Sequence, residues 1–473
     1  MSKQKPSIPQ GTRDFGPIEM LGREYIFDTL RQVFKRYGYQ PIETPSIEQL
    51  DVLTGKYGEE GDRLIFKILN SGDYLGKPLE KGFDFHQAGA SLKLLPLISE
   101  KALRYDLTVP FARYVVMNHH LLQFPFKRYQ IQPVWRADKP QKGRYREFYQ
   151  CDVDVVGANG LLSELELVRI CDAGFHELGL SGVTLRINHR KLLEGIAVHF
   201  GAGDRFVEFI TILDKMDKVG EDGVFKEWEE RGFSVNPEGL QALKSITRAP
   251  VKDAFHQLKA LLGAENPIGQ RGVEELETLF RLVGLRATVS IEPVLDIFLA
   301  RGLGYYTGTI FEAGTHDFRG SILGGGRYDN LTGVFGMEGL SGVGVSFGAD
   351  RIFDLLVARG ILTNRSRSGN RILLINFGGR GMERSVELWM DLIAAGVSAE
   401  MYPEPVKLPK QFKYADQAGF SYVIAMGEQE VDAGTFNFKV LATGHQESVQ
   451  LSSAMAFLSS FLKTGTDDKN TTR

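Results

Sequence analysis

The stretch from Phe124 to Gly157, FPFKRYQIQPVWRADKPQKGRYREFYQCDVDVVG, constrains the fold of this chain more than any other. Apolar and polar residues alternate in both halves, around a basic and polar middle. Because successive strand side chains point to opposite faces, this pattern predicts two strands joined by a long loop. Arg136 then lies among polar groups of the first strand, and Gln150 and Asp154 share a face of the second.

The loop between the two predicted strands carries Lys139, Lys142 and Arg144. A polar strand face next to a cationic loop suits an anionic ligand better than a packed core. The alternative is an ordinary hairpin with a solvated outer face, because antiparallel sheets commonly have one polar side.

Length and composition set wide bounds. A chain of 473 residues suggests about three domains. The formal net charge is -3, so any contact with nucleic acid has to come from local basic patches. Cys151 and Cys171 give neither a disulfide framework nor a zinc quartet, and we expect reduced thiols in a cytoplasmic protein. The start of the chain has no signal-peptide pattern, and no stretch approaches the ~18 apolar residues of a membrane helix.

Helices and a strand are predicted on both sides of the opening stretch. Apolar spacing over residues 18–37 predicts a helix, which Gly38 ends as a C-cap glycine would. Residues 39–45 follow as an edge strand, since proline is confined to sheet edges or strand ends. Residues 162–178 predict a second amphipathic helix, and residues 185–188 a short strand.

Residues 55–92 are rich in glycine and charged residues, and they predict a loop region with a weak strand at 64–69. Asp106 and Thr108 then precede a helix near 111–120. From an extended segment both side chains would point the same way, and together they would grip an ammonium group. The alternative is that they cap the helix, which is the commoner use of such residues.

A mostly helical module is predicted from about 190 to 288, with core stripes of Phe and Met. The strand pattern returns at 294–312, where Arg301 stands at a glycine-rich turn beside Tyr305 and Tyr306. Glycine lets the backbone approach a ligand closely, and an arginine there can bind a phosphate through two parallel hydrogen bonds.

Residues 342–351 run from a glycine-rich strand into a helix, but without the spacing of a dinucleotide fingerprint.

A linker is predicted over 361–370. Lys407, Lys410 and Lys413 form one cationic helical face, which is either simply solvated or meets RNA phosphates. The last residues predict a disordered tail. Beyond the linker the pattern alternates as in a small α/β sheet, with strands at 371–376, 397–402, 421–426 and 435–441 and helices at 381–395, 408–418 and 452–463.

Several of these segments resemble the class II aminoacyl-tRNA synthetases. Residues 135–138 and 144–148 resemble motif 2 of that class, residues 38–45 resemble motif 1, and residues 342–351 resemble motif 3. The segments LARGLGYYTGTIFE and GGGRYD resemble the pair of signatures specific to the histidyl-tRNA synthetase family. The last domain, with LPKQFKYADQAG, resembles that family's anticodon-binding domain. The resemblance covers nearly the whole chain, in the right order.

The resemblance implies an α+β catalytic domain with a mixed, mainly antiparallel sheet, an inserted helical module and a C-terminal α/β anticodon-binding domain. We expect the catalytic domain over residues 1–188 and 290–362, the module over 189–289, and the anticodon-binding domain over 370–465. The implied activity is activation of L-histidine with ATP and Mg²⁺ to histidyl-adenylate, followed by transfer to the 3′-terminal adenosine of the histidine tRNA. A cytoplasmic homodimer without membrane contact is implied as well.

The family's residue roles carry over by position. The resemblance implies that Arg136 and Arg301 are catalytic and face each other across the α-phosphate of ATP. It implies that the ATP-binding residues are Arg136, Arg144, Phe148 and Arg351. It implies that histidine is bound by Asp106, Thr108 and Gln150 at the ammonium group, by Asp154 and Tyr306 at the imidazole nitrogens, by Arg136 and Arg301, and by Tyr305 lining the pocket. No protein ligand of a metal is implied.

The sequence departs from the family at a few positions. Asp106 and Asp154 stand where the family usually has glutamate, and Asp138 and Asp350 replace the usual acids of motifs 2 and 3. Gly304 stands where many members have an acidic residue. Every arginine that the chemistry needs is present.

Three other classes of protein fit the sequence less well. A non-catalytic paralogue, such as the regulatory subunit of the first enzyme of histidine biosynthesis, generally lacks the C-terminal domain and has degraded arginine signatures. An RNA-binding or stress-sensing module on this fold would need extra kinase-like or basic segments. A class I synthetase would carry His-Ile-Gly-His and Lys-Met-Ser-Lys-Ser signatures, and both are absent from the sequence.

Overall fold

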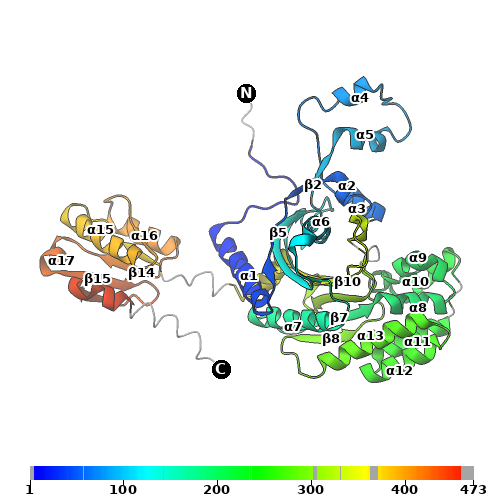
Figure 1. Ribbon diagram of the computed structural model, residues 1–473. Coiled ribbons are helices and arrows are strands. Elements are labelled where there is room, and N and C mark those ends of the chain that lie inside the picture. The colour runs from blue at the N-terminus through cyan, green and yellow to red at the C-terminus, as the bar shows by residue number, and fades with distance from the viewer. Residues whose placement is uncertain are drawn as a thin grey trace. The chain divides into compact units, whose positions relative to one another are not determined.

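The computed structural model in Figure 1 describes residues 5–56, 58–141, 143–233, 235, 237–301, 306–330, 332–362 and 371–459. The chain divides into two compact units, residues 1–359 and residues 360–473. Each unit has its own β-sheet and its own hydrophobic core. Within the described residues, no helix is long and apolar enough to cross a membrane.

The main sheet of the first unit has eight strands among the described residues. The outer pairs β1·β5 and β7·β8 are parallel, and the strands between are antiparallel. The predicted mixed, mainly antiparallel sheet is therefore confirmed. In spatial order the strands are β1 (Gln40–Pro41), β5 (Phe126–Trp135), β6 (Glu147–Val156), β11 (Gly342–Gly348), β10 (Phe318–Tyr328), β9 (Thr309–Thr315), β7 (Val183–His189) and β8 (Ile291–Leu295).

Helices cover one face of this sheet. They are α1 (Pro17–Arg36), α7 (Leu162–Glu177) and α14 (Ala349–Ala358). Phe347 of β11 packs between them, with its ring centroid 5.9 Å from that of Phe34 in α1 and 5.3 Å from that of Phe175 in α7. Because side chains alternate along a strand, the neighbouring residues Ser346 and Gly348 project from the other face.

A row of directly paired residues crosses that other face. Paired residues on neighbouring strands project to the same side of a sheet, so a polar row faces away from the covering helices. Glycine in the middle of the row leaves room above the sheet. The row consists of Arg186 in β7, Glu312 in β9, Gly324 in β10, Ser346 in β11, Asp152 in β6 and Gln130 in β5.

The segment between β1 and β5 differs from its prediction. The weak strand predicted at 64–69 is confirmed by β3, but short helices stand where the rest of 55–92 was predicted to be a loop. Three short strands form a sheet of their own, and α4 and α5 project from the unit in Figure 1. The predicted helix near 111–120 is present and begins slightly earlier. The elements are β2 (Ile47–Gln49), α2 (Leu50–Leu53), α3 (Gly58–Leu64), β3 (Lys67–Ile68), α4 (Gly76–Glu80), α5 (Ala90–Ile98), β4 (Lys101–Leu103) and α6 (Thr108–Asn118).

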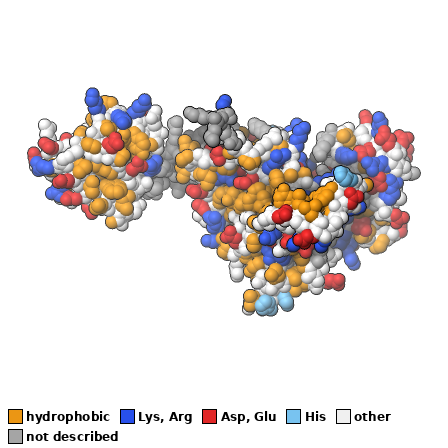
Figure 2. Space-filling view, turned by 90° about the horizontal axis from the view of Figure 1, so that it is seen from above, with side chains coloured by type: hydrophobic (Ala, Val, Ile, Leu, Met, Phe, Trp, Pro, Cys, Tyr) orange, Lys and Arg blue, Asp and Glu red, His pale blue; other side chains and the backbone are white. Residues whose placement is uncertain are grey.

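Helices α4 and α5 pack on little of their own chain. None of the residues of α5 is buried, and α4 buries only Pro78. Figure 2 looks onto this side of the molecule and shows hydrophobic side chains gathered there. From the end of β3 to the end of α5, the exposed large hydrophobic residues are Leu69, Tyr74, Leu79, Phe85 and Leu92.

Between the parallel strands β7 and β8 the chain is helical, as predicted. The Phe209 ring stacks on Trp228 at 4.6 Å, so the aromatic stripe is core. Two apolar runs joined by a turn were expected within 294–312, and each is a strand only at its outer end, in β8 and β9. Residues 302–305 lie outside the described residues. The helices are α8 (Arg190–His199), α9 (Phe206–Leu213), α10 (Met216–Glu230), α11 (Pro237–Arg248), α12 (Val251–Leu262) and α13 (Pro267–Val283).

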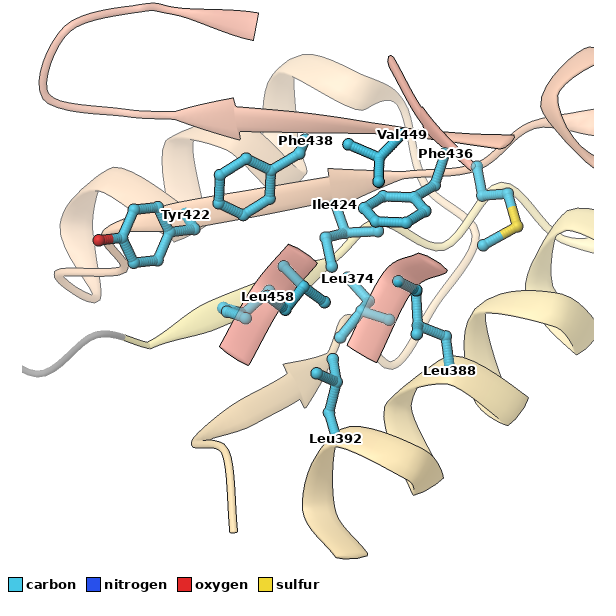
Figure 3. Close-up of a cluster of buried hydrophobic side chains, with 12 residues drawn as sticks. Leu374, Leu388, Leu392, Tyr422, Ile424, Phe436, Phe438, Val449 and Leu458 are labelled. Atoms are coloured by element: carbon cyan, nitrogen blue, oxygen red, sulfur yellow. The ribbon is translucent and has the colours of Figure 1, made fainter. Parts of the chain in front are cut away.

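The second unit is the predicted α/β domain. One side of its sheet forms a core with α15, where Leu388 and Leu392 meet Leu374, Ile424 and Phe438 (Figure 3). The short helix α17 and strand β16 were not predicted. The predicted linker and tail fall largely or wholly outside the described residues. The elements are β12 (Ile372–Leu374), α15 (Gly379–Ala394), β13 (Ala399–Met401), α16 (Leu408–Gln417), β14 (Tyr422–Ala425), α17 (Glu428–Ala433), β15 (Thr435–Val440) and β16 (Gln446–Gln450).

Candidate active site

A cavity of about 570 Å³ opens over the polar face of the main sheet. It is lined by residues of strands β6, β9, β10 and β11, together with the starts of α6 and α14 and the loop after β5. All predicted site residues within the described part of the chain line it. These are Asp106, Thr108, Arg136, Arg144, Phe148, Gln150, Asp154, Arg301, Tyr306 and Arg351, while Tyr305 lies outside the described residues.

Strand alternation explains why the acids of β6 face the cavity. Cys151 and Val153 are buried toward the helices, and Gln150, Asp152 and Asp154 project into the cavity. The Gln150 amide donates to the Ser346 hydroxyl on β11 at 2.8 Å. The sequence predicted that Gln150 and Asp154 share a face, and they do.

Arginines form one of two charged groups in the cavity. Burial lowers the pKa of Arg351, and the positive charges of Arg301, Arg136 and Arg144 lower it further, so these three guanidinium groups lie within electrostatic reach of Arg351. Arg351 is held by carbonyl groups, donating to Gly143 O at 2.7 Å and Ser321 O at 2.6 Å. Such a concentration of positive charge suits a polyanion.

Arg136 is fixed by its surroundings. Its Nε donates to the Tyr105 carbonyl at 3.0 Å, and its guanidinium carbon lies 4.4 Å from the Tyr105 ring centroid and 5.2 Å from the Phe148 ring centroid. A guanidinium held by its Nε and by aromatic faces keeps a defined orientation. Arg144 is more exposed and pairs with Asp138 at 3.0 Å.

Carboxylates form the second charged group. Asp154 is buried, with its Oδ2 2.9 Å from Arg128 Nη2 and its Oδ1 accepting from the Tyr328 hydroxyl at 2.8 Å. Asp152 lies farther from the same arginine, at 3.9 Å. Burial raises the pKa of both acids, that of Asp152 to about 7, and Arg128 opposes the rise.

Asp106 is the third acid of this group, and its charge also raises the pKa of Asp152 and Asp154. Its Oδ1 accepts from the Val109 backbone N–H at 3.2 Å, at the start of α6. The capping role that the sequence allowed is therefore real, and it coexists with a place in the cavity wall. Thr108 is the first residue of the same helix.

Glycines on β10 and β11 make room for the acids. A Cβ at Gly344 would lie 1.9 Å from Asp154 Oδ1, and one at Gly325 would lie 2.2 Å from the Gly344 carbonyl. A Cβ at Gly326 would meet the Tyr306 ring at 2.9 Å. The glycine-rich strands thus let backbone and polar side chains approach closely, which a floor of larger residues would prevent.

Comparison with known proteins decides the family. A model described as histidyl-tRNA synthetase matches residues 11–80 and 84–352, and one described as anticodon binding domain matches residues 371–461. Proteins called histidine--tRNA ligase from Christiangramia forsetii and Phocaeicola vulgatus are each 49% identical, covering 94% of this chain and 97% of their own. The crystal structure of histidyl-tRNA synthetase from Nostoc sp. PCC 7120 is 31% identical, with a TM-score of 0.78, covering 96% of this chain and 99% of its own.

The chain belongs to the histidyl-tRNA synthetase family. Both the recognised family and the predicted fold class are thereby confirmed, including the C-terminal anticodon-binding domain. The resemblance had rested on short motifs, whereas the relatives match over almost their whole length.

The cavity of this histidyl-tRNA synthetase family member holds residues that the sequence did not single out. Lys56, Asp152 and Tyr328 line it, and Arg128 lies fully buried beside the acids. Alternation along β6 already placed Asp152 with Gln150 and Asp154, so that residue was within reach of the sequence argument. Arg128 was not, because its partner depends on the register between β5 and β6.

Proposed function

We propose that this cavity is the site where the chain joins histidine to AMP. The chain is a histidine–tRNA ligase, which activates L-histidine with ATP to histidyl-adenylate and pyrophosphate and then charges the 3′-terminal adenosine of the histidine tRNA. The observation that carries the assignment of the site is the separation of charge, with acids clustered around Arg128 and arginines clustered around Arg351. Histidine presents cationic and imidazole groups, and ATP presents phosphates, so the two substrates match the two groups.

The acidic group suits the amino acid. Asp106, Thr108 and Gln150 would bind the α-ammonium, whose three N–H donors need acceptors. Asp154 and Tyr306 would bind the two imidazole nitrogens. A side chain without those nitrogens would forgo the hydrogen bonds to this acid and this phenol, and this loss discriminates against it.

The cationic group suits ATP. When the histidine carboxylate oxygen attacks the α-phosphorus and pyrophosphate leaves, negative charge is spread over the equatorial oxygens. Arg136 and Arg301, which line the same cavity, would stabilise that charge from opposite sides. Arg144 and Arg351 would hold the outer phosphates, and Phe148 and Arg351 would enclose the adenine.

We propose that Mg²⁺ enters with ATP rather than as a resident ion. Among the described residues, no group of three or more His, Cys, Asp or Glu side chains could hold a metal. Mg²⁺ binds readily through substrate phosphates and water with few protein ligands, so the ATP-bound ion fits these residues. It would supply further neutralisation of the phosphate charge.

A cytoplasmic homodimer completes the proposal. The motif-1-like strand β1 stands at the outer edge of the main sheet with both residues exposed, which suits a pairing surface. Cys151 and Cys171 are free, buried thiols, as expected in a reducing compartment. The non-catalytic alternative is disfavoured, because the C-terminal domain and the arginines are all present.

The test is exchange of labelled pyrophosphate into ATP, which should depend on L-histidine and on no other amino acid. Arg301→Ala should lower the exchange rate by about two to three orders of magnitude, because it removes a charge that acts in the transition state. The variant should still fold and melt cooperatively, since the Arg301 side chain is half exposed and Arg186 remains 3.5 Å from Glu312. Exchange with another amino acid, or wild-type rates in the variant, would contradict the proposal.

A further inference from the structure

A buried acid lies directly behind Arg301. Glu312, on β9, is 3% exposed, and its Oε2 pairs with Arg301 Nε. Its other oxygen lies 3.5 Å from Arg186 Nη2, and Arg186 Nη1 lies 3.4 Å from Asp296 Oδ2. No residue role derived above uses Glu312, although it is the closest charged partner of a proposed catalytic group.

Glu312 lies on the face of the sheet over which the cavity opens. It belongs to the polar row of the main sheet, where its partner on β10 is Gly324, a cavity-lining residue. A Cβ added at Gly324 would meet nothing within 4 Å, so open space adjoins the acid. The Arg301 side chain is 51% exposed at this wall, whereas the Glu312 side chain is 4% exposed. A buried acid therefore anchors an arginine whose side chain is half exposed.

The atom that Glu312 binds matters for what Arg301 can do. A guanidinium is planar, with one N–H at Nε and four at the two Nη atoms. A carboxylate on Nε fixes the plane and leaves the Nη donors on the other side for a second anion. Burial raises the pKa of Glu312, and the neighbouring Arg301 and Arg186 oppose the rise, so the two arginines favour the ionised form of the acid.

We propose that Glu312 is a positioning residue for Arg301, holding its guanidinium so that the Nη donors meet the α-phosphate as the histidine carboxylate attacks. This inference rests on the proposed function of the cavity. Glu312 itself touches no substrate. Without the Glu312 contact, the Arg301 guanidinium has to be oriented anew each time the transition state forms. This entropic cost lowers kcat more than it weakens substrate binding.

Glu312→Gln is the direct test, since it keeps the size of the side chain and removes the charge. We expect kcat of histidine-dependent pyrophosphate exchange to fall about tenfold, with KM for histidine within about twofold of the wild type. In an Arg301→Ala background the same substitution should cause no further loss. Wild-type kcat in Glu312→Gln, or an equal loss in both backgrounds, would overturn the proposal.

Glu312→Asp provides a second test in case the Glu312→Gln variant does not fold. It keeps a charge for Arg186 but shortens the reach to Arg301, so an intermediate loss of kcat is expected, again absent in the Arg301→Ala background. Asp317→Asn is the matched control, because it breaks an arginine–acid pair with Arg359 at the turn between β9 and β10, outside the cavity wall. It should leave exchange unchanged. Absence of histidine-dependent exchange in the wild-type protein would contradict the proposed function. Normal exchange in the wild type together with normal kcat in Glu312→Gln would contradict only the role of Glu312.

Discussion

Asp152 and Asp154 lie two residues apart on β6 and depend on one guanidinium, that of Arg128. The closer acid is 2.9 Å from it and the other is 3.9 Å away. One positive charge cannot neutralise two buried carboxylates, and the nearby Asp106 adds a third negative charge. We therefore expect the three acids of the free protein to keep a proton at pH values where an exposed aspartate is ionised. The positive charge of the histidine ammonium is suited to replace that of this proton.

This shared arginine makes a prediction for pH dependence. The pKa of Asp152 is raised to about 7 in the folded state, so the folded state binds the proton more tightly than the unfolded chain. That stabilisation is fully present below the unfolded pKa of about 4 and is lost as the pH rises through the folded pKa. The side chain of the Asp152→Asn variant cannot ionise. The melting temperature of the variant minus that of the wild type should therefore increase as the pH rises from about 5 to about 8.

Thermal melts of both proteins across this range check the prediction. Asp317→Asn is the control, because its arginine partner lowers the pKa of Asp317, and its difference from the wild type should be constant above about pH 5. A constant difference for Asp152→Asn as well would show that this acid ionises freely in the folded protein.

Site residues could be predicted from the sequence where a single strand or turn is enough to place the side chain. Gln150 and Asp154 follow from alternation along β6, and Arg301 follows from its glycine-rich turn. Arg128 and Glu312 do not, because Arg128 is defined by an acid on another strand and Glu312 by an arginine in the turn that precedes its own strand. A long loop separates β5 from β6, so the register that brings Arg128 to Asp154 cannot be read from the chain alone.

Among the elements, strand β11 depends most on its glycines. A Cβ at Gly344 would lie 1.9 Å from Asp154 Oδ1 and 2.9 Å from the Val153 carbonyl. Asp154 cannot move aside without leaving Arg128 or Tyr328, so Gly344→Ala should displace the acid. We predict that KM for histidine in pyrophosphate exchange rises about tenfold or more, while KM for ATP changes little.

Steady-state exchange kinetics with each substrate varied in turn test this prediction. Gly314→Ala on β9 is a suitable control, since the nearest atom to its added Cβ is a carbonyl oxygen at 3.8 Å, an ordinary contact. It should leave both KM values unchanged. An unaltered KM for histidine in Gly344→Ala would mean that the sheet yields around the new methyl group and that Asp154 stays in place.

Element prediction failed where packing gives no periodic signal. Helices α3 and α4 stand within residues 55–92, which were predicted to be a loop because they are rich in glycine and charged residues, and α4 buries only Pro78, so no helical stripe is imposed. By contrast α1 and α7, which press Phe34 and Phe175 onto the sheet, carry a clear apolar face and were predicted closely. Periodicity reports burial, so an unburied helix leaves little trace in the sequence.

At the scale of the whole molecule, chemistry and tRNA reading fall in different units. Every residue proposed for the active site lies in residues 1–359, and the anticodon-binding domain lies in residues 371–461. The second unit has two hydrophobic clusters of its own, one on each side of its sheet, as expected of a part that folds independently. The composition shift near residue 361 predicted this division.

A fragment of residues 1–362 should therefore keep histidine activation and lose efficient charging of tRNA. Its pyrophosphate exchange should stay within about threefold of the full chain, because no proposed site residue is removed. Its kcat/KM for charging the histidine tRNA should fall by about a hundredfold or more, because a second binding module no longer raises the effective concentration of the acceptor end. Loss of exchange in a fragment that melts like the first unit of the full chain would instead show that the C-terminal unit supports the catalytic centre itself.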